Sequence, residues 1–261
     1  MKKLGIALGA GGSRGVAHVG FLQALEEEGI KPDYITGSSM GAIVGAAYAT
    51  GMPIEEIKEI VLNLRVRKLI APTLKRGGFL SFRKARKILQ KYLGDISFED
   101  LKIPFRCVAV EINCGHVVEL SKGKLLDGVI ASATIPGAFH PIEKDGMRLV
   151  DGGVLERVPA CRVREMGADV VVAVDVLGWR RMPPKKTGVV KVLLGTFDIM
   201  DNYRTQTYRE ENRDKIDFWL EPELGDMSQY SMKQIAFAYE QGYKLGKENA
   251  AAIKKALKSK K

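Results

Sequence analysis

Two glycine-rich turns near the start of the chain constrain its fold more than any other feature. The first spans residues 9–15 and follows the apolar run 4–8, and the second spans residues 37–41 and follows the run 34–36. A short apolar run that ends in glycine and continues into a helical pattern is typical of a buried strand that turns sharply into a helix. Two such units in succession predict a three-layer α/β/α fold with a mainly parallel central sheet.

The second turn, Gly37-Ser38-Ser39-Met40-Gly41, has the GxSxG form of a nucleophile elbow. In such an elbow, glycines on both sides of the serine allow a strained turn that holds its hydroxyl above the sheet. Ser39 is therefore the candidate nucleophile, and Gly37 and Gly41 are the elbow glycines. The next helix begins at Met40, so its free N–H groups and positive end point at the nucleophile, where an oxyanion would develop.

The first turn contains Gly11 and Gly12, whose backbone N–H groups are further candidate oxyanion donors. If the two strands are neighbours, this turn aims those N–H groups at the place where the Ser39 oxygen would attack a carbonyl. The two turns together indicate acyl transfer or ester hydrolysis.

A nucleophilic serine needs a base, and none of the three histidines of the chain is well placed for that role. The order of an α/β-hydrolase is serine, acid, histidine, but His18 precedes Ser39, and His116 and His140 precede the best acid. That acid is Asp151, where an apolar strand ends in Asp-Gly-Gly. A carboxylate within hydrogen-bond distance of the serine could take its proton directly.

These residues together resemble the patatin-like phospholipases, whose pattern is a glycine-rich oxyanion loop with an arginine, then GxSxG, then a distant Asp-Gly-Gly or Asp-Gly-Ala. Matched residue by residue, the resemblance implies an oxyanion loop of Gly11 and Gly12 with Ala10 beside them, a supporting Arg14, the nucleophile Ser39 and the dyad acid Asp151. Some relatives have a further glycine where Ala10 stands, but a backbone N–H donor survives that change.

The resemblance covers about residues 4–176, and residues 131–136 are similar to the family segment ahead of the acid. It implies hydrolysis of lipid acyl esters, with phospholipids or lysophospholipids as substrates and acylglycerols or simple esters as further candidates. The scheme requires no metal and no cofactor. A non-catalytic lipid-binding relative of the same fold is the alternative function.

Each motif also has a simpler interpretation. A single GxSxG or Asp-Gly-Gly in a chain with 28 glycines can be an ordinary turn. Arg14 can be a solvated residue of a first helical turn, and His18, on the same helix face, a packed side chain. Dinucleotide binding fits poorly, because the third glycine of GxGxxG would fall at Arg14 and no acid closes the second strand.

Composition agrees with one globular domain over residues 1–261. The chain is 46% hydrophobic, so it can bury a large core, with the motifs in about residues 4–176 and a helical C-terminal portion in about residues 189–258. No run approaches the roughly 18 apolar residues of a membrane span, and no apolar leader precedes the first strand. Three cysteines without metal-ligand spacing, Cys107, Cys114 and Cys161, indicate free thiols and a cytoplasmic protein.

Hydrophobic periodicity places the remaining elements. It predicts a helix over 14–28, a helix after Pro53, a hairpin of strands 105–112 and 117–120, a buried strand over 170–176, and long helices over 189–213 and 231–258, with an irregular connection at 178–188.

Charge is concentrated in one stretch of the chain. Between Glu59 and Asp95 there is no acidic residue, while basic residues alternate with apolar ones over residues 65–91. Such a stretch would suit peripheral contact with an anionic membrane, and a solvated helix face in a chain of net charge +10 is the alternative. No nucleic acid partner is expected, because basic charge without a binding motif is non-specific.

Overall fold

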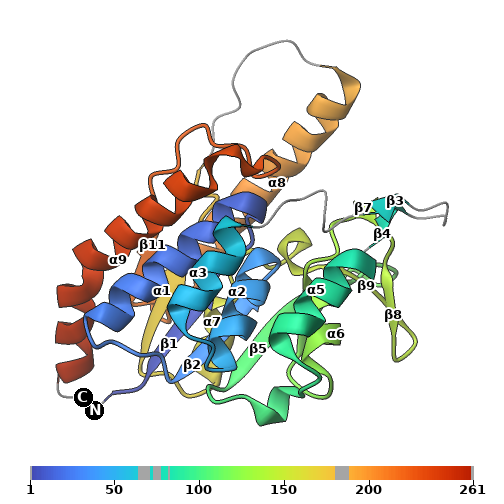
Figure 1. Cartoon of the computed structure of the whole chain (residues 1–261). Helices are drawn as coiled ribbons and strands as arrows, with labels where there is room; N and C mark the ends of the chain where they lie inside the picture. The colour runs from blue at the N-terminus through green and yellow to red at the C-terminus, as the bar shows by residue number, and fades with distance from the viewer. Residues whose placement is uncertain (1, 64–70, 73–77, 82, 180–187, 260–261) are drawn as a thin grey trace.

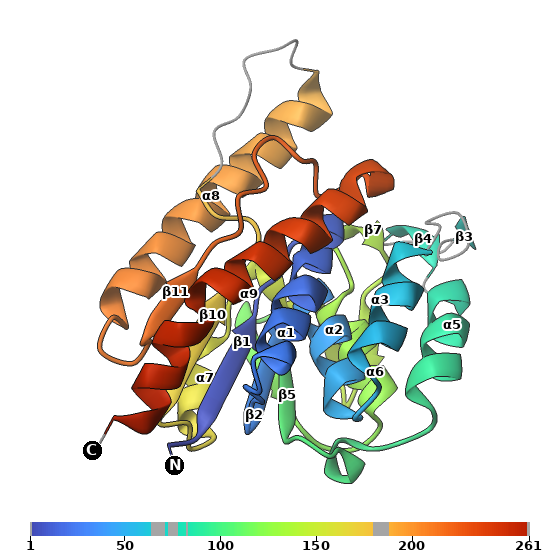
Figure 2. The ribbon, with the colours of Figure 1, turned by 60° about the vertical axis from the view of Figure 1, so that its left-hand side comes forward.

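An eight-stranded sheet runs through the middle of the protein in the computed structural model, which describes residues 2–63, 71–72, 78–81, 83–179 and 188–259 (Figures 1 and 2). In order across the sheet, the strands are β11 (Phe218–Leu220), β10 (Val170–Val174), β1 (Leu4–Leu8), β2 (Tyr34–Ser38), β5 (Phe105–Glu111), β9 (Met147–Asp151) and β8 (Ile142–Lys144), and β6 (His116–Leu120) also pairs with β5. The strands from β11 to β5 are parallel, and β6, β8 and β9 pair antiparallel with their neighbours. The predicted α/β fold with a mainly parallel sheet is confirmed.

Helices connect most of these strands. They are α1 (Ala17–Glu27), α2 (Met40–Ala49), α3 (Ile54–Leu62), α5 (Arg83–Leu93), α6 (Leu125–Ser132), α7 (Ala160–Glu165), α8 (Val189–Glu211) and α9 (Ile235–Lys258), with short 3-10 turns η1 (Gly12–Val16), η2 (Phe98–Asp100), η3 (Gly152–Val154) and η4 (Met232–Gln234). A second, small sheet joins β3 (Ala71–Pro72), β4 (Gly78–Ser81) and β7 (Gly137–Phe139). The predicted helices and strands are present with ends displaced by a few residues, and most of the connection predicted at 178–188 lies outside the described residues.

Alternate residues of the central strand β1 point to opposite faces of the sheet, as the pleat requires. Leu4, Ile6 and Leu8 belong to the main core, which α1, α2 and α9 cover on one face (Figure 1). Ala7 belongs to a second core on the opposite face, which α7 closes together with Tyr208 of α8. Helices therefore cover both faces of the sheet.

Strand β5 brings distant parts of the chain together at one edge. Its partner β6 pairs with Cys107 to Glu111, and a strand residue has only two edges along which to pair. Strands β2 and β9 must therefore share the other edge, where Val108 pairs with Ser38 and the next residue, Ala109, pairs with Asp151. The two strands end facing each other, so the end of β2 meets the end of β9.

The C-terminal helix α9 packs along α1, and its buried residues belong to the same main core (Figure 2). A Cβ on Gly20 would collide with the backbone carbonyl of Tyr239, and a Cβ on Gly242 would collide with that of Ala17. The two helices approach each other through glycine. As a result, α1 is buried on both sides, whereas an ordinary surface helix buries a single apolar stripe.

Gly20→Val should destabilise the protein, because the added side chain meets the backbone of α9. Overpacking of this kind costs about 1–3 kcal/mol, which lowers the Tm of a chain of this size by roughly 2–12 °C. Thermal unfolding followed by circular dichroism measures the effect. Gly188→Ala is the matched control, because Gly188 has φ −81° and no atom lies within 4 Å of an added Cβ. An unchanged Tm in Gly20→Val would contradict the close approach.

Candidate active site

The turn between β2 and α2 holds Ser39 in a strained backbone conformation. Ser39 has φ 53° and ψ −118°, a region that a residue with a Cβ rarely occupies unless its surroundings enforce it. The flanking glycines allow the turn to close. A Cβ on Gly37 would lie 2.6 Å from Cα of Ala42, and a Cβ on Gly41 would collide with the carbonyl of Leu8. Both glycines are therefore required by close backbone contact.

Ser39 and Asp151 lie in direct contact where β2 and β9 meet. The Ser39 hydroxyl donates a hydrogen bond of 2.5 Å to Oδ2 of Asp151, and the N–H of Gly153 donates one of 2.8 Å to Oδ1. The two residues are only 7% and 6% exposed. The carboxylate is thus fixed on both oxygens, with one of them on the serine.

Burial raises the pKa of Asp151 to about 6, although the hydrogen bonds from Ser39 and Gly153 oppose the rise. The carboxylate of Asp201 adds to it. At neutral pH most molecules therefore carry an ionised Asp151, in contact with a hydroxyl. A carboxylate whose pKa lies near the working pH is suited to act as a general base.

The histidines lie elsewhere. His18 is fully buried in α1, where its Nε2 lies 2.8 Å from the carbonyl oxygen of Gly9 and burial lowers its pKa to about 4. Because a carbonyl only accepts, Nε2 of this neutral ring carries the proton. His116 lies exposed on β6, and His140 follows β7. In the described chain, no histidine forms a hydrogen bond with Ser39 or Asp151.

Residues 132–134 hold the backbone of both members of the pair. The N–H of Ser39 donates to Oγ of Ser132 at 3.1 Å, and the N–H of Asp151 donates to the carbonyl of Thr134 at 2.8 Å. The Thr134 hydroxyl in turn donates to the carbonyl of Ile130 in α6 at 2.7 Å. The family resemblance pointed to this segment, but nothing in its residues indicated that Ser132 accepts from the nucleophile's own N–H.

The glycine-rich loop lies beside the pair. A Cβ on Gly153 would be 2.9 Å from Cβ of Ala10 and 3.1 Å from Oδ1 of Asp151. The N–H groups of Gly11, Gly12 and Met40 stand at the beginnings of η1 and α2, where a helix leaves its N–H groups without intrahelical acceptors. None of the three donates to an acceptor in the part of the chain that the structure describes.

Ala10 and Arg14 shape this loop. The N–H of Ala10 donates to the carbonyl of Arg157 at 2.9 Å, so it is already engaged. Arg14 is 4% exposed and not solvated; its Nε donates to the carbonyl of Val176 at 2.7 Å, and its Nη1 donates to that of Met227 at 3.1 Å. Both residues therefore hold the loop in place through hydrogen bonds to backbone carbonyls.

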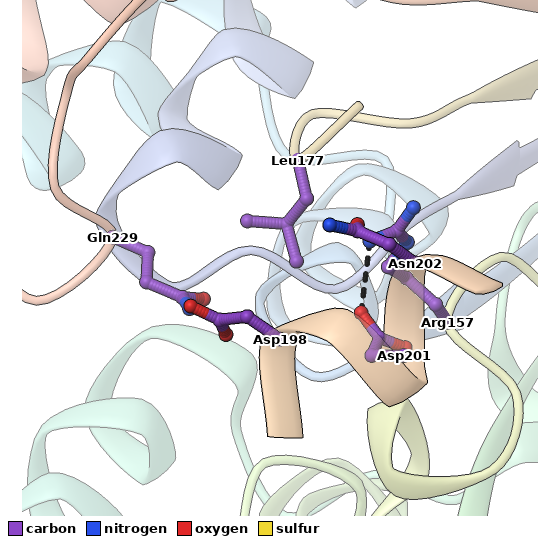
Figure 3. Close-up of a pocket in the computed structure, with 6 residues that line it drawn as sticks. All are labelled: Arg157, Leu177, Asp198, Asp201, Asn202 and Gln229. Carbon is purple, nitrogen blue, oxygen red and sulfur yellow. Dashed lines mark hydrogen bonds and ion pairs between the residues drawn. The ribbon is translucent and has the colours of Figure 1, made fainter. Parts of the chain in front are cut away.

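A buried network that no motif indicated lies behind the loop. Arg157 is 3% exposed and donates to Asp175 at 2.9 Å, to Asp201 at 2.8 Å and to Asn202 at 2.9 Å. Figure 3 shows Arg157, Asp201 and Asn202 around a small pocket that Leu177, Asp198 and Gln229 complete. The network connects the end of β10 and the helix α8 to the segment after Asp151. Its partners are far apart in sequence, so no short pattern could reveal it.

One group of potential metal ligands occurs among the described residues. Glu111, Cys114 and His116 lie close together in the hairpin of β5 and β6. The Glu111 carboxylate already accepts hydrogen bonds from the N–H groups of Cys114 and Arg148, which accounts for its position by hairpin geometry. None of the described helices is both long and apolar enough to cross a membrane.

The sequence is similar to a known protein family and to several individual proteins. The family model described as patatin-like phospholipase matches residues 6–161. An uncharacterized NTE family protein of Mycobacterium bovis is 36% identical over 186 residues, which are 70% of this chain and 51% of the relative. A neuropathy target esterase of Drosophila melanogaster is 32% identical over 66% of this chain and 13% of its own length, and a lysophospholipase of Emericella nidulans is 30% identical over 67% of this chain and 12% of its own. The chain thus spans about half the length of the mycobacterial relative.

Solved structures share the fold at low sequence identity. The crystal structure of VipD from Legionella pneumophila superposes with a TM-score of 0.64 at 16% identity, over 96% of this chain and 67% of that one. The type III effector protein ExoU gives a TM-score of 0.54 at 14% identity, over 99% of this chain and 54% of that one.

Asp151→Asn should stabilise the fold at neutral pH. The folded protein raises the pKa of this carboxyl from 3.8 to about 6, so between these values the folded state keeps a proton that the unfolded state has lost. Stability therefore falls as pH rises through this window. Asparagine retains the shape without the charge, so its advantage should grow up to about pH 6 and then level off, on the order of 3 kcal/mol.

Urea unfolding of both proteins from pH 4.5 to 8 measures the free energy of unfolding. A lower free energy of unfolding for Asp151→Asn than for the parent at pH 8 would contradict the prediction, because it would mean that the ionised Asp151 stabilises the folded protein.

Proposed function

Because the chain belongs to the patatin-like phospholipase family, we propose that it is a serine hydrolase that cleaves fatty acyl esters of lipids, with Ser39 as nucleophile and Asp151 as base. The observation that carries the proposal is the 2.5 Å hydrogen bond from the Ser39 hydroxyl to the Asp151 carboxylate. The hydroxyl is the donor in this bond, so its proton already points at the group that would accept it.

In the first half of the reaction, Asp151 takes the hydroxyl proton while Oγ of Ser39 attacks the ester carbonyl. The carbonyl oxygen becomes negatively charged, and the open N–H groups of Gly11, Gly12 and Met40 are the donors proposed to stabilise it. When the tetrahedral intermediate collapses, the bond to the alcohol breaks and protonated Asp151 returns its proton to the leaving oxygen. An acyl ester on Ser39 remains.

In the second half, Asp151 takes a proton from water, and the resulting hydroxide attacks the acyl ester. Collapse releases the fatty acid and returns the proton to Ser39. One carboxylate thus serves as base and acid in turn, which a pKa of about 6 suits better than the usual value near 4. These residues complete the cycle without a metal ligand or a cofactor.

Lysophospholipids are the proposed substrates, with phospholipids and simpler acyl esters as further candidates. The family description names phospholipases, and a fungal relative that is 30% identical over two thirds of this chain is named a lysophospholipase. The relatives are longer than this chain, so the choice between these esters needs direct measurement of the products released from defined lipids.

A non-catalytic lipid-binding protein is the second candidate. Against it stand two features that cost stability and serve no evident purpose in a scaffold: the positive φ of Ser39 and the buried Asp151 carboxylate. Labelling by a fluorophosphonate distinguishes the two functions, because it requires an activated serine.

Ser39→Ala should abolish both lysophospholipid hydrolysis and fluorophosphonate labelling, since only the nucleophilic oxygen is lost. Asp151→Asn should lower turnover by at least about 10²-fold, because an amide cannot accept the proton. Ser38→Ala is the matched control: this neighbouring buried hydroxyl has no hydrogen-bond partner among the described residues. Release of fatty acid is the measurement, and full activity of Ser39→Ala would remove this serine from the mechanism.

The basic stretch 65–91 is the proposed site of peripheral contact with anionic membranes. Residues 64–70, 73–77 and 82 lie outside the described residues, but α5 presents Lys84 and Lys87 to solvent. Arg86 instead forms an ion pair of 2.7 Å with Asp127, so it is less available to lipid. The two lysines are therefore the charges to test.

Lys84→Glu/Lys87→Glu should weaken binding to anionic vesicles by at least about tenfold, since each charge near such a surface is worth about 1 kcal/mol. Binding to neutral vesicles should change little, and added salt should mimic the substitution. Lys255→Glu/Lys258→Glu is the matched control, because these exposed lysines have the same spacing on α9. Equal losses in both double variants in a vesicle sedimentation assay would leave 65–91 as an ordinary solvated surface.

A further inference from the structure

The helix α8 has the reverse of the usual amphipathic pattern. Its outward positions are apolar and highly exposed: Val192 51%, Leu193 55%, Phe197 65%, Ile199 64%, Met200 60% and Tyr203 73%. These residues, called here the α8 apolar face, recur at spacings of three and four and so form one side of the helix. The opposite side carries Asp201, Asn202 and Thr205, of which the last two are 5% and 4% exposed.

The polar side of α8 is anchored, so the helix cannot turn its apolar face inward. Arg157 binds both Asp201 and Asn202, and Arg204 binds Asp201 and donates to the carbonyl of Gly153 at 3.1 Å. The bonds from Arg157 to Asp201 and Asn202 and from Arg204 to the carbonyl of Gly153 join α8 to other segments, so they would break if the helix rotated about its axis. The exposure of the α8 apolar face is therefore built into the fold, and contiguous exposed apolar surface marks a site of interaction.

The same anchors place α8 beside the catalytic pair. Arg204 also donates to the carbonyl of Val154, and the carboxylate of Asp201 is close enough to raise the pKa of Asp151. Val154, three residues after the acid, is itself 39% exposed. The helix α8 therefore lies next to the segment that carries Asp151.

Two exposed aromatic residues follow residues that share a pocket with α8. Leu177 and Gln229 line one pocket with Asp198 of α8 (Figure 3), and Trp179 and Tyr230 come two residues and one residue after them in the sequence. Trp179 is 62% exposed and Tyr230 is 60% exposed. A mixture of aliphatic side chains with exposed tryptophan and tyrosine is typical of surfaces that sit at a lipid–water interface.

We propose that the α8 apolar face docks onto a lipid surface and inserts its side chains into the interfacial layer next to the active site. The inference rests on the proposed lipid substrate, because Ser39 is only 7% exposed and an acyl chain that comes from a lipid surface beside the site does not have to cross water. Charge agrees with this occupant. The α8 apolar face has no charged member, Asp198 is turned into the pocket, and the chain has a net charge of +10, so headgroups of neutral or anionic lipids meet no repulsion.

The test measures vesicle binding in a Ser39→Ala background, so that binding does not depend on hydrolysis. Leu193→Ser/Phe197→Ser/Met200→Ser should reduce partitioning onto phosphatidylcholine vesicles in 0.5 M salt by at least about tenfold, because three apolar side chains no longer leave water. Ile112→Ser/Phe237→Ser is the matched control, since these residues are exposed at 46% and 38% but lie outside α8. High salt removes the contribution of the basic stretch 65–91.

A second readout locates the contact. Phe197→Trp should show blue-shifted emission relative to its parent on adding vesicles, and lipids brominated on the acyl chain should quench it. The proposal would be overturned if the triple variant bound vesicles as well as its parent does, or if vesicles left the emission of Phe197→Trp unchanged. A dimer in sedimentation equilibrium that the triple variant converts to a monomer would assign the face to a second copy of the chain. If the parent binds vesicles through α8 but hydrolyses no ester, the proposed function fails and the docking surface stands.

Discussion

The pairing of β5 determines where the chemistry of this protein takes place. Strand β5 has two edges along which other strands can pair, and β6 occupies one of them from Cys107 to Glu111. Strands β2 and β9 follow each other along the remaining edge, one parallel and one antiparallel, and their ends meet at Val108 and Ala109. Ser39 and Asp151, 112 residues apart in sequence, become neighbours by this register. A slip of one residue would turn the side chains of either strand to the other face and separate the pair.

Two features of the site lower the stability of the fold, and the surrounding structure holds both in place. Ser39 has a positive φ, and Asp151 is an acid buried to the point that its pKa rises to about 6. Hydrogen bonds from the backbone to Ser132 and Thr134 fix both residues, and the buried Arg14 and Arg157 fix the glycine loop beside them. Strain and buried charge persist at functional sites when the rest of the fold over-determines them. Arg157 also anchors α8, so one residue holds the loop through its backbone carbonyl and the helix through its guanidinium group.

Much of this arrangement could be predicted from the sequence, because it depends on local patterns. The glycines on either side of Ser39 predict the nucleophile elbow, and apolar runs that end in glycine predict parallel strands followed by helices. Three features could not be predicted in the same way: the hydrogen bond from the N–H of Ser39 to Ser132, the buried ion pairs of Arg157, and the exposed apolar face of α8. Each depends on contacts between segments far apart in the chain, and Asp201 and Asn202 become recognisable as inward-facing only once Arg157 is seen between them. Arg14 shows the same limit, since a charged side chain near a helix start gives no sign that it is buried among backbone carbonyls.

The central claim is that a carboxylate, and no histidine, activates Ser39. The most direct test is the second-order rate constant of fluorophosphonate labelling at Ser39 as a function of pH, in the parent, in His116→Ala/His140→Ala and in Asp151→Asn. The account predicts that the first two proteins give the same curve, rising through about pH 6 as Asp151 ionises, while Asp151→Asn stays low at every pH. A curve that disappears in the histidine variant and persists in Asp151→Asn would contradict it.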